Sequence, residues 1–214
     1  MGRFIIKYMR LTRANQDDVA LKAAEALRKG EVILHPTETV YGLACDPKNE
    51  EALKLLYEIK NRLEEKPVSV MVDSIGMADK YGIFSNYATS LLDQFWPGPV
   101  SVMVLKRRGM LPEFFNPGHK FVAIRYSNDS FCQDLVEKFG GPIVTTSANL
   151  SDKPACYKVQ DVKKQLGVRR FGKLGLVVDE GKLEENPPST IVKIVGDTTV
   201  FVRGDGSELG GIMR

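Results

Sequence analysis

Short apolar segments alternate with amphipathic helical patterns along most of this chain, and this alternation limits the fold more than any other feature. Strands that are apolar on both sides need cover on both faces of a sheet, which helices with one apolar stripe supply. The pattern predicts strands at 32–34, 68–72, 100–105, 121–125, 143–145, 174–178, 190–194 and 199–203. It predicts helices from a cap at Asn15 or Asp17 to Arg28, and at 50–60, 76–81, 87–95, 129–139 and 159–166. We therefore expect an α/β domain with a twisted, mixed, open sheet and flanking helices.

Length and composition favour one globular domain. The chain has 214 residues, of which 43% are hydrophobic, and a formal net charge of +3. That length can bury a full core in one domain. We expect this domain to span residues 1–204, followed by a loose, Gly-rich tail at 205–214. A mild positive charge suits an anionic ligand without proving one.

The sequence favours a cytoplasmic protein. It contains no apolar stretch of the roughly 18 residues that a membrane helix needs, and the apolar run at 4–6 is too short for a signal peptide. Its three cysteines, Cys45, Cys132 and Cys156, are odd in number and widely spaced, which fits neither a zinc site nor a disulfide framework. We expect reduced thiols.

Polar side chains gather where the first predicted strand ends. Pro36 cannot donate to a sheet ladder, so strand 32–34 should stop there, and Thr37, Glu38 and Thr39 follow. The pair Tyr41-Gly42 predicts a second sharp turn. Open α/β sheets place ligand sites at such strand ends, so we expect this polar group to face a ligand.

Other segments repeat that arrangement. Strand 143–145 leads into Thr145, Thr146, Ser147 and Asn149, whose hydroxyl and amide groups could hold a phosphate or a carboxylate or simply form a capping turn. Ser189 and Thr190 stand at the entrance of the strand at 190–194.

Basic residues at three places in the sequence are candidates for the functional site. Lys60, Arg62 and Lys66 place three cations within seven residues, which suits a nucleoside triphosphate but also fits a solvated helix end neutralised by nearby glutamates. Arg125 follows four apolar residues and needs a partner once the sheet packs, unless it reaches water at an edge. Arg203 precedes Gly204 and by itself could be a surface residue before a turn.

These segments, in this order, resemble the YrdC-domain family of threonylcarbamoyl-AMP synthases. The resemblance is carried by the run Pro36-Thr37-Glu38-Thr39-Val40-Tyr41-Gly42-Leu43, the loop from Lys60 to Pro67, Ser147-Ala148-Asn149, Ser189-Thr190 and Arg203-Gly204. It spans nearly the whole chain and implies a single-domain form with a basic, concave ligand cavity. The implied reaction converts L-threonine, bicarbonate and ATP into threonylcarbamoyl-AMP and pyrophosphate, for the threonylcarbamoyladenosine modification of tRNA.

The resemblance also implies roles for individual residues. Lys60 and Arg62 would be the catalytic pair. The ATP contacts would be Lys60, Arg62, Lys66, Ser147, Asn149 and Arg203. The threonine contacts would be Thr37, Arg125, Thr145 and Ser189. Mg²⁺ would arrive with ATP, and downstream tRNA threonylcarbamoyl-transferase proteins would be the partners.

The chain departs from the family pattern at three positions. Asn61 and Leu63 stand where Gly or Pro is common, and Met71 stands where some members carry His. The only histidines, His35 and His119, are far apart and predict no protein-bound metal. His35 is expected to be structural. The alternative function is a YrdC-like module that binds double-stranded RNA or tRNA without synthesis; it would leave the polar and basic site without a reaction.

Overall fold

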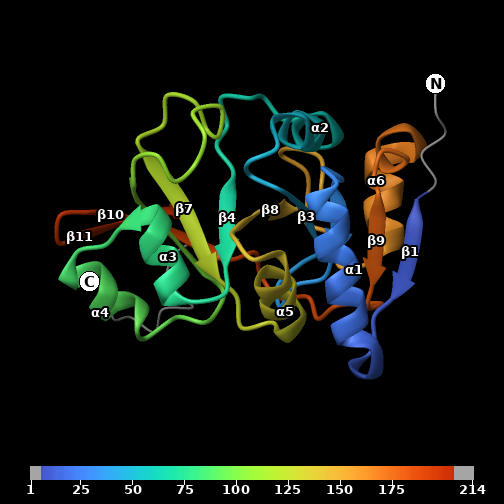
Figure 1. Ribbon diagram of the computed structural model, residues 1–214, viewed down its shortest axis with the longest axis horizontal. Helices are drawn as coiled ribbons and strands as arrows, with labels where there is room; N and C mark the ends of the chain where they lie inside the picture. The colour runs from blue at the N-terminus through green and yellow to red at the C-terminus, as the bar shows by residue number, and fades with distance from the viewer. Residues whose placement is uncertain (1–5, 205–214) are drawn as a thin grey trace.

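The computed structural model describes residues 6–204 (Figure 1). One mixed sheet runs through this part of the chain in the order β1-β9-β2-β3-β8-β4-β7-β6-β10-β11, with β5 paired to β6. The strands are β1 (Lys7–Arg10), β2 (Ile33–His35), β3 (Gly42–Cys45), β4 (Ser69–Val72), β5 (Gly82–Ile83), β6 (Val100–Lys106), β7 (Phe121–Tyr126), β8 (Ile143–Ser147), β9 (Leu176–Asp179), β10 (Thr190–Val195) and β11 (Thr198–Arg203). The sheet contains parallel pairs, such as β4 with β7, and antiparallel pairs, such as β6 with β7, which confirms the predicted mixed α/β fold.

Helices cover both faces of the sheet. They are α1 (Gln16–Arg28), α2 (Glu50–Lys60), α3 (Ile75–Tyr81), α4 (Asn86–Leu92), α5 (Ser130–Phe139) and α6 (Val159–Phe171), with a 3-10 turn at Arg13–Asn15. Helices α1 and α5 pack together over the face that carries Ile33, Ala44 and Met71. The other face packs against α2, α3, α4 and α6. None of the helices within residues 6–204 is long and apolar enough to cross a membrane.

Local sequence explains the helix ends. The side chain of Asn49 accepts a hydrogen bond from the backbone of Ala52 at 2.9 Å and begins α2, and Asp129 does the same for α5 through Cys132 at 2.8 Å. Gly140 ends α5 with a φ of 79°, a left-handed conformation that glycine adopts freely. Asn15 begins α1 without such a cap, since its side chain binds the backbone of Arg10 and Thr12 instead.

The structure corrects several details of the predicted fold. Strand β1 was missed because an edge strand of mostly exposed residues shows no apolar alternation. The turn expected at Tyr41-Gly42 is wrong: Gly42 begins β3, which pairs with β2, so the chain reverses over 36–41. Strand β8 extends two residues beyond its predicted end at Thr145, so Thr146 and Ser147 also lie within it. Helix α6 continues to Phe171 beyond a break at Gly167, where φ is 73°. The tail expected at 205–214 lies outside the described residues.

Candidate active site

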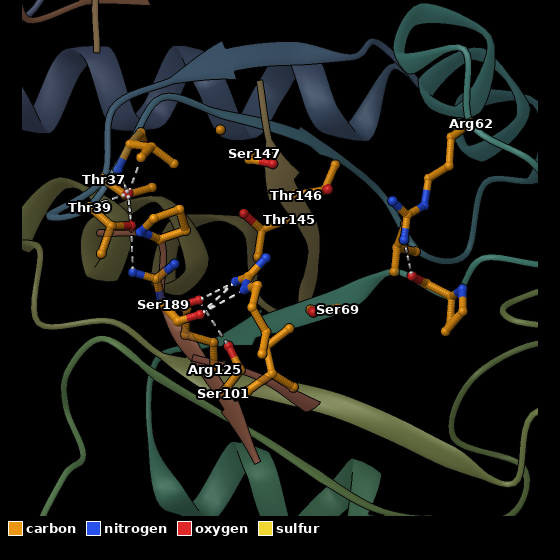
Figure 2. A pocket seen from close by; sticks show the side chains of 17 residues that line it. Thr37, Thr39, Arg62, Ser69, Ser101, Arg125, Thr145, Thr146, Ser147 and Ser189 are labelled. Carbon is orange, nitrogen blue, oxygen red and sulfur yellow. Dashed lines mark hydrogen bonds between the residues drawn. The ribbon is translucent and has the colours of Figure 1, made fainter. Parts of the chain in front are cut away.

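A cavity of about 140 Å³ opens on the sheet face beside α1 and α5 (Figure 2). Its lining is rich in hydroxyl groups and contains three guanidinium groups. The hydroxyl residues are Thr37, Thr39, Ser69, Ser101, Thr145, Thr146, Ser147 and Ser189, and the cations are Arg62, Arg125 and Arg203. Such a surface can donate many hydrogen bonds and hold negative charge.

Sheet register, and not proximity in sequence, assembles the floor of this cavity. Ser69 of β4 lies opposite Thr145 of β8, and Ser101 of β6 lies opposite Arg125 of β7. Directly paired residues in a sheet point to the same face. The register therefore brings side chains from four strands onto one surface.

Thr37 uses its hydroxyl to hold the loop after β2. Its Oγ1 atom accepts from the backbone amides of Thr39 and Val40, both at 3.1 Å, and donates to the Val40 carbonyl at 2.8 Å. Thr37 is also only 5% exposed. The predicted threonine contact thus lines the cavity while its hydroxyl is engaged within the loop.

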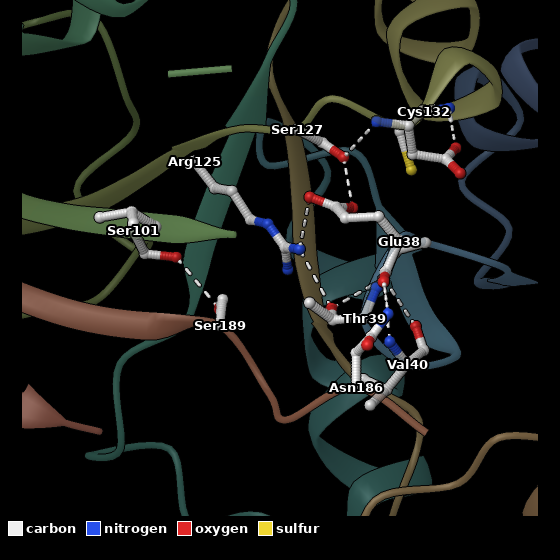
Figure 3. Close-up of polar contacts among 12 residues, drawn as sticks. Glu38, Thr39, Val40, Ser101, Arg125, Ser127, Cys132, Asn186 and Ser189 are labelled. Carbon is white, nitrogen blue, oxygen red and sulfur yellow. Dashed lines mark hydrogen bonds and ion pairs between the residues drawn. The ribbon is translucent and has the colours of Figure 1, made fainter. Parts of the chain in front are cut away.

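Arg125 is buried and held by the same loop (Figure 3). Its Nη2 atom lies 2.9 Å from Glu38 Oε1 and donates to Thr39 Oγ1 at 3.0 Å. The sequence predicted that a cation closing an apolar strand would need a partner, and Glu38 is that partner. Buried charge requires such compensation.

Ser189 and Arg203 form the end of the site at β10 and β11. The Nε and Nη2 atoms of Arg203 donate to the Ser189 carbonyl at 2.9 and 2.7 Å, and Nη2 also reaches Ser189 Oγ at 2.9 Å. Ser189 Oγ lies 3.4 Å from Ser101 Oγ. Two of the predicted residues, one from each half of the implied site, are therefore in direct contact.

Lys60 and Asn149 lie behind the cavity and do not line it. Lys60 is 1% exposed. Its Nζ atom donates to the Ser147 carbonyl, to the Asn149 carbonyl at 2.9 Å and to Asn149 Oδ1 at 3.3 Å. Burial lowers the pKa of Lys60 to about 7, and the nearby charge of Arg62 adds to that shift. In this conformation the lysine fixes the loop that follows β8.

The other two residues of the basic loop differ in exposure. Arg62 lines the cavity, and its Nε and Nη2 atoms donate to the carbonyls of Lys66 and Pro67 at 3.1 and 2.7 Å. Lys66 points outward and pairs with Asp152 at 3.0 Å, where both side chains are largely exposed. An exposed pair of this kind contributes little to stability.

The three departures from the family pattern have structural explanations. Asn61 ends α2 with a φ of 50°, a left-handed conformation that Asn tolerates and Gly prefers. Leu63 is 66% exposed. Met71 packs in the core beside α5, so it is not among the residues that line the cavity.

His35 is buried at the end of β2, as expected for a structural residue. Its Nδ1 atom lies 2.8 Å from the Pro36 carbonyl, and burial lowers its pKa to about 4. A Cβ atom at Gly42 would lie 2.9 Å from His35 Nε2, which explains the glycine at the start of β3. Within residues 6–204, no group of three or more His, Cys, Asp or Glu is placed to hold a metal ion. The three cysteines are free and buried.

Sequence reasoning missed several cavity residues. Ser69 and Ser101 each interrupt an otherwise apolar strand, between Val68 and Val70 and between Val100 and Val102. A single serine within an apolar strand was the signal in the sequence that could have identified each of these two residues. Thr39 and Thr146 stood inside motifs already recognised, but only the fold shows that they line the cavity.

Comparisons with known proteins all relate this chain to one protein family. The Sua5_yciO_yrdC family, described as "Telomere recombination", matches residues 25–204. A threonylcarbamoyl-AMP synthase of Bacillus subtilis is 33% identical over 194 residues, covering 90% of this chain and 55% of the relative. A threonylcarbamoyl-AMP synthase of Vibrio cholerae is 37% identical over 173 residues, covering 79% of this chain and 89% of the relative. The chain thus spans about half of the first relative and most of the second.

Solved structures show the same fold. P. abyssi Sua5 complexed with L-threonine superposes with a TM-score of 0.85 at 27% identity, covering 98% of this chain and 62% of that protein. E. coli YciO superposes with a TM-score of 0.81 at 23% identity, covering 94% and 97%.

Proposed function

This chain belongs to the Sua5/YciO/YrdC family, and on that premise we propose that it is an L-threonylcarbamoyladenylate synthase. The reaction would join L-threonine, bicarbonate and ATP into threonylcarbamoyl-AMP and release pyrophosphate. The observation that carries the proposal is the cavity itself, in which three arginines meet a wall of hydroxyl groups. Relatives of this chain are named for that product, and one solved relative holds L-threonine.

The amino acid half of the site centres on Arg125. Its guanidinium is anchored on one nitrogen and lines the cavity, so its remaining donors suit the carboxylate of threonine. Thr145 lies in the same wall and supplies a hydroxyl. Thr37 would act by shaping the loop, because its own hydroxyl is engaged there.

The nucleotide half centres on Arg62, Ser147 and Arg203. Each of these three lines the cavity and can donate to phosphate oxygens. Lys60 and Asn149 would contribute through the loop that they hold in place behind Ser147. Lys66 would strengthen the positive field at the rim and not contact ATP in the conformation described.

The chemistry needs positioning and charge more than a protein nucleophile. The threonine amine would combine with bicarbonate to give a carbamate and water. A carbamate oxygen would then attack the α-phosphate, a new P–O bond would form, and the bond to pyrophosphate would break. Fixed donors around the cavity would stabilise the charge that develops on the phosphate oxygens.

Mg²⁺ would enter with ATP, held mainly by the phosphate oxygens. The product would pass to a transferase that modifies tRNA. The alternative function, RNA binding without synthesis, draws on the net charge of +3 but gives no role to a buried, anchored arginine.

The test is pyrophosphate release by the purified chain. With Mg²⁺ and ATP present, release should require both L-threonine and bicarbonate. Release that persists without threonine would indicate a different acceptor. Binding of tRNA with no pyrophosphate release under any condition would favour the RNA-binding alternative.

A further inference from the structure

Arg125 is held on one side only. Its Nη2 atom contacts Glu38 Oε1 at 2.9 Å and Thr39 Oγ1 at 3.0 Å (Figure 3). Its Nε atom is buried without a hydrogen-bond partner among residues 6–204. Buried donors are nearly always satisfied, so the unused donors of a cavity-lining arginine point to a ligand.

Glu38 is itself fixed from two directions. Its Oε2 atom accepts a hydrogen bond from Ser127 Oγ at 2.6 Å, just beyond the end of β7. Its backbone carbonyl accepts from Asn186 Nδ2 at 3.0 Å, in the segment that leads to β10. Through its carboxylate and its backbone carbonyl, Glu38 therefore ties the loop after β2 to two other parts of the site.

Glu38 is not among the residues that line the cavity, whereas Arg125 and Thr39 are. The side chain of Glu38 is 17% exposed and that of Arg125 is 8% exposed. The ion pair is thus largely shielded from water, where a fixed carboxylate orients a guanidinium more strongly than it would at the surface. The side chain of Glu38 therefore acts on a ligand in the cavity through the arginine and not by direct contact.

We infer that Glu38 is a positioning residue that pins Nη2 of Arg125 and leaves the other donors of the guanidinium for the carboxylate of the amino acid substrate. The inference rests on the proposed function, because it assigns that ligand to Arg125. It predicts that losing Glu38 weakens amino acid binding and leaves nucleotide binding nearly unchanged. It also predicts that Glu38 has no effect on amino acid binding once Arg125 is gone.

The experiment is a double-mutant cycle on equilibrium binding, with L-threonine and ATP titrated separately by calorimetry. Glu38→Ala should raise the Kd for L-threonine roughly tenfold or more, because Arg125 loses its buried ion-pair partner, and change the Kd for ATP less than about threefold. In a protein that already carries Arg125→Ala, Glu38→Ala should change the Kd for L-threonine by less than about twofold. Glu38→Gln keeps an acceptor for Arg125 and should fall between wild type and Glu38→Ala. Glu180→Gln, at an exposed carboxylate outside the cavity, is the matched control.

The outcomes separate the inference from the function on which it rests. Equal losses for threonine and ATP, an unchanged threonine Kd, or the same loss with and without Arg125 would overturn the positioning role. If Glu38→Ala does not fold, as judged by circular dichroism, the cycle is run with Glu38→Gln, for which a smaller rise in the threonine Kd that disappears in the Arg125→Ala background is expected and an unchanged Kd overturns the positioning role. A wild-type protein that binds no L-threonine would instead overturn the proposed function.

Discussion

Lys60 and Asn149 are 89 residues apart in the chain, yet the lysine ammonium donates to the Asn149 carbonyl at 2.9 Å and to its Oδ1 atom at 3.3 Å. The contact sits directly behind Ser147, whose carbonyl also accepts from Nζ. A motif residue that the family resemblance assigns to ATP is here the anchor of the adjoining loop. That arrangement makes stability depend on pH.

Lys60→Met should expose this dependence. The folded-state pKa of Lys60 is about 7 against an ordinary value of 10.5, so between these values the unfolded chain binds a proton that the folded chain lacks. Stability carried by this group therefore rises with pH across that window. The free energy of unfolding of the wild type, minus that of Lys60→Met, should grow by at most about 1.4 kcal/mol per pH unit. Urea denaturation at pH 7, 8 and 9 measures it, and a difference that stays flat would contradict the buried, perturbed lysine.

His35→Asn tests a second buried group. The folded-state pKa of His35 is about 4 and its ordinary value is 6.5, so below pH 6.5 the unfolded chain binds a proton that the folded chain does not. The wild type should lose up to about 3 kcal/mol of stability as the pH falls through this range. His35→Asn can keep a donor near the Pro36 carbonyl and should lack this loss. His119→Asn should retain it, and equal acid sensitivity of all three proteins would rule out His35 as the cause.

Arg125→Lys should act on the amino acid and not on ATP. Lysine keeps the charge but cannot contact Glu38, Thr39 and a ligand with one planar group. The Michaelis constant for threonine should rise roughly 10–100-fold, the scale of a lost charged hydrogen bond, with a smaller change for ATP. Steady-state kinetics with each substrate varied in turn decide this. A selective loss for ATP would move Arg125 to the nucleotide half.

Arg62→Ala should cripple synthesis while the fold survives. Arg62 lines the cavity, and its contacts within the loop are to carbonyls of neighbouring residues. Losing a charged contact to the phosphates should cost about 2–4 kcal/mol of transition-state stabilisation. The readout is kcat/KM for pyrophosphate release, with Lys182→Ala as a control at an exposed ion pair. Near-normal kcat/KM in Arg62→Ala would remove this residue from the reaction.

The sequence predicted the elements that have a local cause. Helix α2 was predicted at its observed bounds from its regular apolar stripe, and the structure shows that Asn49 caps it. Strand β3 was missed because Gly42 signals a turn in sequence, whereas it is required by the His35 ring that packs against it. Strand β1 carries mostly exposed residues and depends on pairing with the distant β9.

Most of the residues that the sequence predicted for the site line the cavity, but the sequence did not predict how they are arranged in space. Six of the proposed contacts, Arg62, Arg125, Thr145, Ser147, Ser189 and Arg203, do line the cavity, together with the engaged Thr37. Lys60 and Asn149 do not line the cavity, because they hydrogen-bond to each other although they lie in distant segments of the chain. Nothing local in the sequence encodes that pairing. Glu38 stood inside the first motif, yet its role depends on a strand almost ninety residues away, since Arg125 lies in β7.

We propose that this chain builds a carbamate on threonine and attaches it to AMP. The most direct measurement is mass spectrometry of the products after incubation with ATP, Mg²⁺, L-threonine and ¹³C-labelled bicarbonate. We expect threonylcarbamoyl-AMP that is one mass unit heavier than the product made from unlabelled bicarbonate, together with pyrophosphate. ATP consumption that yields an adenylate without the label, or no adenylate at all from a folded protein that binds both substrates, would contradict it.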